Sequence, residues 1–196
     1  MRRRTLHGPL TVVNVRLIRR ALREAKRLGK YPNMMFTIHP GHLEQCPCDA
    51  GRFFERGVVA WLGGWFRRQG HPWTAVWTRE NYLSPHREHM HMLLHVPKRL
   101  QKPLARALAR RWPDPGVAHL RPVDDAHEAF AYIVKQHTPQ AHYALGFRVR
   151  RERHCRRDQT PVAPVLGRRV SMTRDLERLV RCQEIGAADV GGYHAR

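Results

Sequence analysis

The chain has 196 residues, with 36 Lys or Arg against 16 Asp or Glu, which gives a formal net charge of +20. This length allows one hydrophobic core and excludes a nuclease domain joined to a separate motor domain. No apolar run reaches the roughly 18 residues of a transmembrane helix, so we expect a cytoplasmic protein without membrane association. So large an excess of positive charge repels itself unless a polyanion neutralises it, and nucleic acid is therefore the expected partner.

The first predicted element is a basic amphipathic helix over residues 11–29, where aliphatic side chains recur at helical spacing between Arg and Lys. The short apolar run at 34–39, which follows Pro32, favours a buried strand. From Asp49 to about Gln69, aromatic and aliphatic residues again follow the helical period, with Asp49 as the N-cap. The glycines of this stretch weaken a helix by roughly 1 kcal/mol each relative to alanine, so we expect it to depend on packing and to deviate from a straight helix.

Two strand-like runs at 73–80 and 88–96 are separated by a short segment with Asn and Pro, which predicts an antiparallel hairpin. A short basic helix is expected at 100–112 and a strand at 117–122, after the turn sequence WPDPG. The mixture of strands and helices indicates an α+β fold, in which a central antiparallel sheet has flanking helices.

Asp124 and Asp125 are expected to cap a helix that runs to Gln136 and has an apolar stripe of helical period. A final helix is expected at 171–185. Between these helices, residues 148–157 are almost continuously basic, which is typical of a solvated or nucleic-acid-bound segment. The expected phosphate contacts of this segment are Arg148, Arg150, Arg151, Arg153, Arg156 and Arg157.

The segment EHMHMLLHV is the strongest candidate for a metal site. Strand alternation places His89, His91 and His95 on one face, with the first two imidazoles about 7 Å apart, so both can reach one ion above the sheet. Glu80 ends the neighbouring strand and can supply a carboxylate, whereas its rival Glu88 adjoins His89 and so points to the opposite face. Two neutral imidazoles and a carboxylate suit a divalent Mn or Mg ion with open positions for a phosphate oxygen. The alternative is a pair of ordinary half-buried strand histidines.

A second candidate is Tyr132, which stands three residues before Lys135 and would be its neighbour on a helix surface. A phenol is a weak nucleophile at neutral pH, and a nearby ammonium or metal ion favours the phenolate. We therefore identify Tyr132 as the candidate nucleophile and Lys135 as its activating cation. The alternative is a boundary tyrosine beside an ordinary surface lysine.

The loop HPGHLEQCPC gathers four side chains of the kinds that zinc prefers, namely His39, His42, Cys46 and Cys48. Their spacing is not a standard finger pattern, and a Pro-containing connection is the alternative. With Cys155 and Cys182, the chain has four cysteines in all, which make a poor disulfide framework for this length and fit a reducing compartment.

Taken together, FTIHP as the first strand, Glu80 followed by HMHMLLHVP, and AFAYIVKQ with its YxxK pattern resemble the HUH endonucleases over roughly residues 33–137. The resemblance implies a central antiparallel, RRM-like palm with the tyrosine helix alongside, and attack on a DNA phosphate to give a 5′-phosphotyrosine and a free 3′-hydroxyl. The tyrosine follows the histidines, as in single-tyrosine rolling-circle replication initiators and transposases and unlike conjugative relaxases; YxxK is more similar to the initiators. The sequence has no GxxxxGKS phosphate loop, so strand separation would need a host helicase.

The resemblance divides the chain into a basic amphipathic N-terminal helix at 1–30, an HUH endonuclease domain at 31–140 and a basic C-terminal extension at 141–196. The expected function is metal-dependent, site-specific nicking and joining of single-stranded DNA at an origin, which starts rolling-circle replication of a plasmid or phage. One alternative is a single-tyrosine transposase that acts on DNA hairpins. The other is a non-catalytic single-strand-binding module in which the sheet and basic tails supply the affinity.

Overall fold

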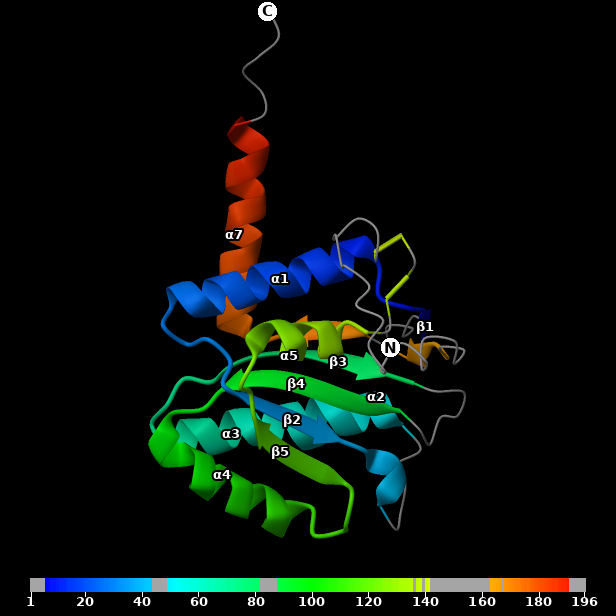
Figure 1. The fold of residues 1–196 in the computed structure, drawn as a ribbon, viewed down its shortest axis with the longest axis vertical. Coiled ribbons are helices and arrows are strands. Elements are labelled where there is room, and N and C mark those ends of the chain that lie inside the picture. The colour runs from blue at the N-terminus through cyan, green and yellow to red at the C-terminus, as the bar shows by residue number, and fades with distance from the viewer. Residues whose placement is uncertain are drawn as a thin grey trace, which may run out of the picture.

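The computed structural model describes residues 6–43, 49–81, 88–135, 137–138, 140–141, 163–166 and 168–190. Its centre is a five-stranded antiparallel sheet in the spatial order β5-β2-β4-β3-β7 (Figure 1). The strands are β2 (Met34–Ile38), β3 (Thr74–Glu80), β4 (His89–His95), β5 (Ala118–Pro122) and β7 (Val170–Met172). A separate pair is formed by β1 (Leu6–His7) and β6 (Val165–Leu166). The α+β fold with a central antiparallel sheet is thus confirmed.

Helices cover both faces of the sheet (Figure 1). On one face lie α1 (Val12–Arg27), α5 (Ala126–Ile133) and α7 (Arg174–Val190). On the other lie α2 (Ala50–Arg52), the π-helix η2 (Phe53–Val59), α3 (Ala60–Arg68) and α4 (Lys98–Arg111); the short 3-10 helix η1 (Pro40–His42) follows β2. Within the described residues, no helix combines the length and apolar character that crossing a membrane requires.

The sheet separates two hydrophobic cores because its strands alternate strictly. Phe36, Trp77 and Met92 face the core under α3 and α4, whereas Val76 and Leu93 face the core under α1 and α5. Strand β4 is central and buried on both faces, which explains its long apolar run. The predicted hairpin of β3 with β4 is confirmed by their antiparallel pairing.

Helix α1 starts at a capping box and is part of the core. The Thr11 side chain accepts a hydrogen bond from the Asn14 backbone N–H, and the Asn14 side chain accepts one from the Thr11 N–H. Its buried stripe packs against the sheet through Val15, Ile18, Ala21, Leu22 and Ala25. The side chains of Arg16, Arg23, Lys26 and Arg27 on the other face are exposed.

The predicted helix after Asp49 is present but is not a regular α-helix. The Asp49 carboxylate accepts a hydrogen bond from the Arg52 N–H at 2.9 Å and so caps the helix as expected. The wider π-helical turns of Phe53–Val59 then precede α3. Gly57 lies in this π segment, so the irregularity falls where the sequence lacks helix propensity.

The C-terminal part of the chain contributes to the hydrophobic core under α1 and α5. Strand β7 pairs with β3, and Leu176 and Val180 of α7 pack with residues of α1 and the sheet. The expected final helix is therefore present, although its start is Arg174 and a strand precedes it. The six arginines expected to contact phosphates lie outside the described residues, as do Cys46 and Cys48.

Candidate active site

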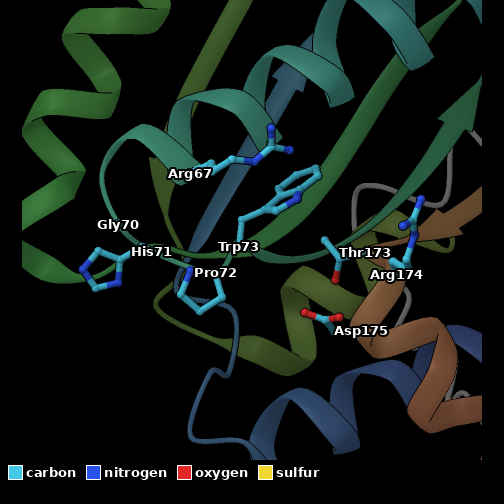
Figure 2. Close-up of a pocket in the computed structure, with 9 residues that line it drawn as sticks. Arg67, Gly70, His71, Pro72, Trp73, Thr173, Arg174 and Asp175 are labelled. Atoms are coloured by element: carbon cyan, nitrogen blue, oxygen red, sulfur yellow. The ribbon is translucent and has the colours of Figure 1, made fainter.

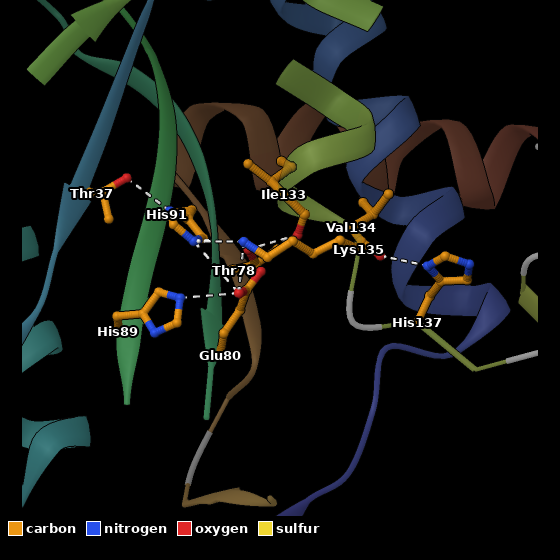
Figure 3. A network of polar contacts seen from close by, with 9 residues as sticks. All are labelled: Thr37, Thr78, Glu80, His89, His91, Ile133, Val134, Lys135 and His137. Atoms are coloured by element: carbon orange, nitrogen blue, oxygen red, sulfur yellow. Dashed lines mark hydrogen bonds and ion pairs between the residues drawn. The ribbon is translucent and has the colours of Figure 1, made fainter. Parts of the chain in front are cut away.

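Glu80, His89 and His91 converge on one face of the sheet where β3 pairs with β4 (Figure 3). In the antiparallel register, Glu80 lies opposite His89 and Thr78 lies opposite His91, so the carboxylate and both imidazoles project from the same face. Their ligand atoms all lie within 4.8 Å of one another, and the residues are 1%, 6% and 1% exposed. The three residues chosen from the sequence thus form one buried group that could hold a metal ion.

The protonation states of this group suit a divalent cation. Burial by itself would raise the pKa of the Glu80 carboxyl, but His91, the hydrogen bond from His89 and the charge of Lys135 hold that pKa well below its usual range. Burial lowers the pKa of His91 to about 4, although Glu80 acts in the opposite direction. Near neutral pH the group therefore offers a carboxylate and a neutral imidazole, which are the forms that bind metals.

The contact with the Lys135 ammonium, which is closer to His91 Nε2 than the Glu80 carboxylate at 3.5 Å is, indicates the tautomer of His91. Its Nδ1 lies 2.8 Å from Thr37 Oγ1 on β2, and its Nε2 lies 3.2 Å from Lys135 Nζ. An ammonium group can only donate, so Nε2 accepts and the ring proton is on Nδ1, which donates it to the Thr37 hydroxyl. The lone pair of Nε2 therefore faces the centre of the group, and Thr37 orients the ring from behind as outer partners of metal-binding histidines do.

The ammonium of Lys135 lies among the candidate metal-ligand atoms (Figure 3). Its Nζ is 3.0 Å from Glu80 Oε2 and 3.2 Å from His91 Nε2, while the lysine side chain is 23% exposed. A cation thus already contacts two of the three donors, which shows that the donor set accommodates positive charge. An ion bound to the same carboxylate oxygen and imidazole nitrogen would have to displace this ammonium.

Tyr132 is half-buried beside this group. Its ring contacts the His91 imidazole edge to face, with the centroids 4.8 Å apart, and Lys135 Nζ lies 3.7 Å from the tyrosine ring centroid. From β5, Arg121 places its guanidinium carbon 5.4 Å from the same centroid. One imidazole and two cations therefore contact the single phenol that the sequence singled out.

The end of α5 determines where Lys135 lies. Thr78 Oγ1 donates a hydrogen bond to the Ile133 carbonyl at 2.9 Å, and His137 Nδ1 donates one to the Val134 carbonyl at 2.8 Å. These bonds satisfy carbonyls that a helix end leaves without intrahelical partners. The prediction that Lys135 belongs to the helix was wrong, because α5 ends at Ile133 and the chain then turns so that the lysine reaches the sheet.

Glu88, the rival carboxylate, lies on the opposite face of the sheet, as strand alternation predicts. Arg79 Nε donates to Glu88 Oε1 at 2.6 Å, and the guanidinium carbon of Arg79 lies 5.4 Å from the centroid of the Phe54 ring. Burial raises the pKa of Glu88, while the charge of Arg79 acts in the opposite direction. Glu88 thus belongs to a buried ion pair in the other core.

Further histidines extend the site across the sheet. The ring of His39 stacks on His89 with centroids 4.7 Å apart, and His42 and His119 contact His39 edge to face at 5.6 and 6.4 Å. Burial, with the neighbouring imidazoles, lowers the pKa of His39 to about 3, so this side chain is neutral near neutral pH. The zinc hypothesis for this loop depends also on its two cysteines, which lie outside the described residues.

Thr37, Thr78 and Arg121 were not selected from the sequence. The two threonines can be recognised as site residues only once the strand order is known, because β2 and β3 flank β4 and each places a threonine opposite His91. Arg121 comes from β5, which pairs with β2 and not with the histidine strand. No local sequence motif identifies such a residue as part of the site.

The candidate active site therefore combines a metal-ligand group, a phenol and two cations at one end of the sheet. Four elements supply them: β3 and β4 the ligands, α5 the phenol, and β5 the arginine, while the lysine follows α5. The chain was compared with protein-family models, with curated proteins and with solved structures, and none of them matched.

Proposed function

We propose that this protein nicks and rejoins single-stranded DNA. Tyr132 is the nucleophile, and Glu80, His89 and His91 are the ligands of a divalent Mn or Mg ion. Lys135 and Arg121 are the cations beside the phenol.

The observation that supports this proposal most directly is the convergence of two separate motifs. Lys135 follows His91 by 44 residues, yet their side chains are in hydrogen-bond contact, and Tyr132 packs on the same imidazole. An ordinary surface lysine would not lie 3.0 Å from a carboxylate of a residue that is 1% exposed. A pair of chance strand histidines would not be expected to share a buried Glu, a phenol and a lysine.

The chemistry follows from these groups. A bound metal ion would polarise a phosphate oxygen and stabilise the charge that develops there. The Tyr132 oxygen forms a bond to phosphorus while the bond from phosphorus to the 3′ oxygen breaks. The phenol loses its proton to solvent, and the departing 3′ oxygen takes one up. A 3′-hydroxyl that attacks the phosphotyrosine reverses these bond changes and rejoins the strand.

Positive charge beside the phenol serves two purposes. It favours the phenolate, which is the attacking form, and it attracts the DNA phosphate. The whole chain has a net charge of +20, and its Lys and Arg side chains outside the site supply phosphate contacts that do not depend on DNA sequence. The exposed side chains of Arg16, Arg23, Lys26 and Arg27 on α1 provide part of this charge.

Initiation of rolling-circle replication is the setting that we propose for this chemistry, since YxxK follows the histidines. A host helicase would then separate the strands. A single-tyrosine transposase would use the same bond changes on hairpin ends, so the two settings differ in the DNA that is cut and not in the site.

The proposal is tested with labelled single-stranded DNA of mixed sequence, incubated with the full chain and Mn and then resolved on a denaturing gel. A 3′-labelled strand should migrate with the protein, whereas a 5′-labelled strand should give only a free fragment. The adduct should disappear with chelator and in Tyr132→Phe, and persist in Tyr31→Phe, which removes a phenol outside the site. An adduct that retains the 5′ label, or that survives in Tyr132→Phe, would exclude the proposed attack.

A further inference from the structure

His89 directs one ring nitrogen toward the centre of the candidate metal-ligand group (Figure 3). Its Nε2 lies 3.1 Å from Glu80 Oε2. A metal ion that binds both atoms would replace this hydrogen bond, so the hydrogen bond cannot orient the ring for the ion. The side chain itself does not fix the direction either, because a histidine ring turns about the bond from Cβ to Cγ in a broad torsional well. The rings that pack against His89 therefore decide how well its orientation is maintained.

His39 covers one face of the His89 ring. The two rings are nearly parallel, with an interplanar angle of 25° and centroids 4.7 Å apart, which is within the range of about 4.5–7 Å that aromatic pairs prefer. His91 contacts the same imidazole edge to face, also with centroids 4.7 Å apart. His89 thus lies between two other imidazoles, and its ring cannot turn about the bond from Cβ to Cγ without leaving the stack on His39.

The backbone holds His39 in the position where it stacks. His39 extends β2 by one residue, since its N–H donates to the Val117 carbonyl at 2.7 Å, and the register of Ile38 with Met90 brings it opposite His89. The residue before a proline is restricted to extended conformations, and His39 precedes the buried Pro40 with a φ of −117° and a ψ of 91°. The His-Pro pair at the end of the first strand therefore leaves the backbone of His39 little freedom.

Two further imidazoles support the His39 ring from outside. His42 and His119 are exposed and contact it edge to face, whereas His39 is half-buried beside them. Among the described residues, the group whose ligand atoms lie within 4.8 Å of one another consists of Glu80, His89 and His91, and His39 is outside it. The contact of His39 with this group is thus made by the face of its ring and not by a nitrogen at the metal position.

We propose that His39 is a positioning residue, whose ring holds His89 in the orientation that a metal ion needs. This inference rests on the proposed function, because it takes Glu80, His89 and His91 as the metal ligands. A ring that is held before the ion arrives loses less side-chain freedom on binding, so the metal binds more tightly. The role requires a flat ring at position 39 and does not require a ring nitrogen.

The test is isothermal titration calorimetry of the chelator-treated full chain with Mn. His39→Ala, which removes the stacked ring, should weaken Mn binding about tenfold, the lower end of the loss that removal of an outer partner of a metal ligand causes. His39→Phe keeps a flat ring and has no nitrogen, so it should restore Mn affinity to within about threefold of the wild type.

A stacked ring elsewhere in the molecule provides the control for a general loss of packing. Trp73 stacks on Trp77, with centroids 6.0 Å apart and an interplanar angle of 14°, and borders a hollow of about 410 Å³ at the end of β3 remote from Glu80 (Figure 2). These indoles pack in the core on the other face of the sheet. Trp73→Leu should therefore lower the midpoint of unfolding in urea while Mn affinity stays within about twofold of the wild type.

The outcomes separate this inference from the proposed function. Wild-type Mn affinity in His39→Ala would overturn the positioning role and leave the metal site intact. Equal losses in His39→Ala and His39→Phe would also overturn it, because they would make His39 a ligand. A loss in Trp73→Leu as large as that in His39→Ala would assign the effect to packing in general. Absence of Mn binding in the wild type would instead refute the metal site of the proposed function, and the inference with it.

Discussion

Replacement of Lys135 by methionine should make the protein bind Mn more tightly, even though it removes a residue of the proposed active site. The Lys135 ammonium contacts Glu80 Oε2 at 3.0 Å and His91 Nε2 at 3.2 Å, which are two of the atoms that a metal would need. In the wild-type chain, metal binding must therefore break these contacts. Methionine fills a similar volume, keeps the packing on Tyr132 and offers no charge to displace.

The size of the effect follows from the contacts that are lost. A hydrogen bond to a charged group contributes about 1.5–3 kcal/mol, and each 1.4 kcal/mol corresponds to a tenfold change in affinity. The Lys135 side chain is only 23% exposed, so solvent screens this interaction less than it screens a surface ion pair. We therefore expect Mn affinity in Lys135→Met to rise roughly 10- to 100-fold over the wild type.

The assay is isothermal titration calorimetry of chelator-treated protein with Mn. Lys98→Met, which removes an exposed lysine at the start of α4, controls for the change in net charge and should stay within about twofold of the wild type. Equal or weaker Mn binding in Lys135→Met would show that the ammonium does not compete with the ion, and would refute the geometry inferred for the metal.

Three further substitutions separate the roles of neighbouring groups. Glu80→Gln should abolish measurable Mn binding, whereas Glu88→Gln, on the opposite face, should leave calorimetric Mn affinity within about threefold. Loss of Mn binding in Glu88→Gln but not in Glu80→Gln would make Glu88 the ligand. Thr37→Val should lower Mn affinity about 10- to 100-fold because His91 loses the partner that fixes its tautomer, and unchanged affinity would assign Thr37 no such role. Thr78→Val should lower the free energy of unfolding in urea by about 1–3 kcal/mol, since it leaves the Ile133 carbonyl without its hydrogen bond; an unchanged unfolding midpoint would argue against this anchor.

Strand alternation made much of the candidate site predictable from the sequence. The spacing of His89 and His91 predicted their common face, the hairpin placed Glu80 at the end of the neighbouring strand, and strand alternation placed Glu88 on the opposite face. These statements need only the period of a strand and the pairing of consecutive strands. Both are local properties of the chain, which is why the triad could be assembled without knowledge of the rest of the fold.

Features that depend on the order of the strands were not predictable in this way. The pairing of β2 beside β4 brings Thr37 to His91, and the pairing of β5 beside β2 brings Arg121 to Tyr132. The position of Lys135 depends on where α5 ends, and a long-range hydrogen bond from Thr78 stabilises that end. Tertiary contacts of this kind leave no periodic signal in the sequence.

The tertiary packing of the C-terminal part was also not predictable from the sequence. Its charge density indicated an extension outside the core, yet β7 lies at the edge of the sheet and α7 packs on α1. Removal of residues 141–196 would therefore delete core elements, and it cannot isolate the contribution of the tail to DNA binding. Replacement of the arginines of 148–157 by glutamine keeps β7 and α7 and is the sharper experiment on that segment.

The central claim is that Tyr132 attacks DNA at the metal-ligand group, and mass spectrometry of the covalent adduct tests it most directly. The full chain is incubated with Mn and single-stranded DNA, the complex is denatured, and protein and DNA are digested before the linked peptide is sequenced. We predict a nucleotide 5′-phosphate esterified to Tyr132, absent after chelation and absent in Glu80→Gln. A phosphate on another residue, or an adduct that forms equally well without metal, would contradict this account.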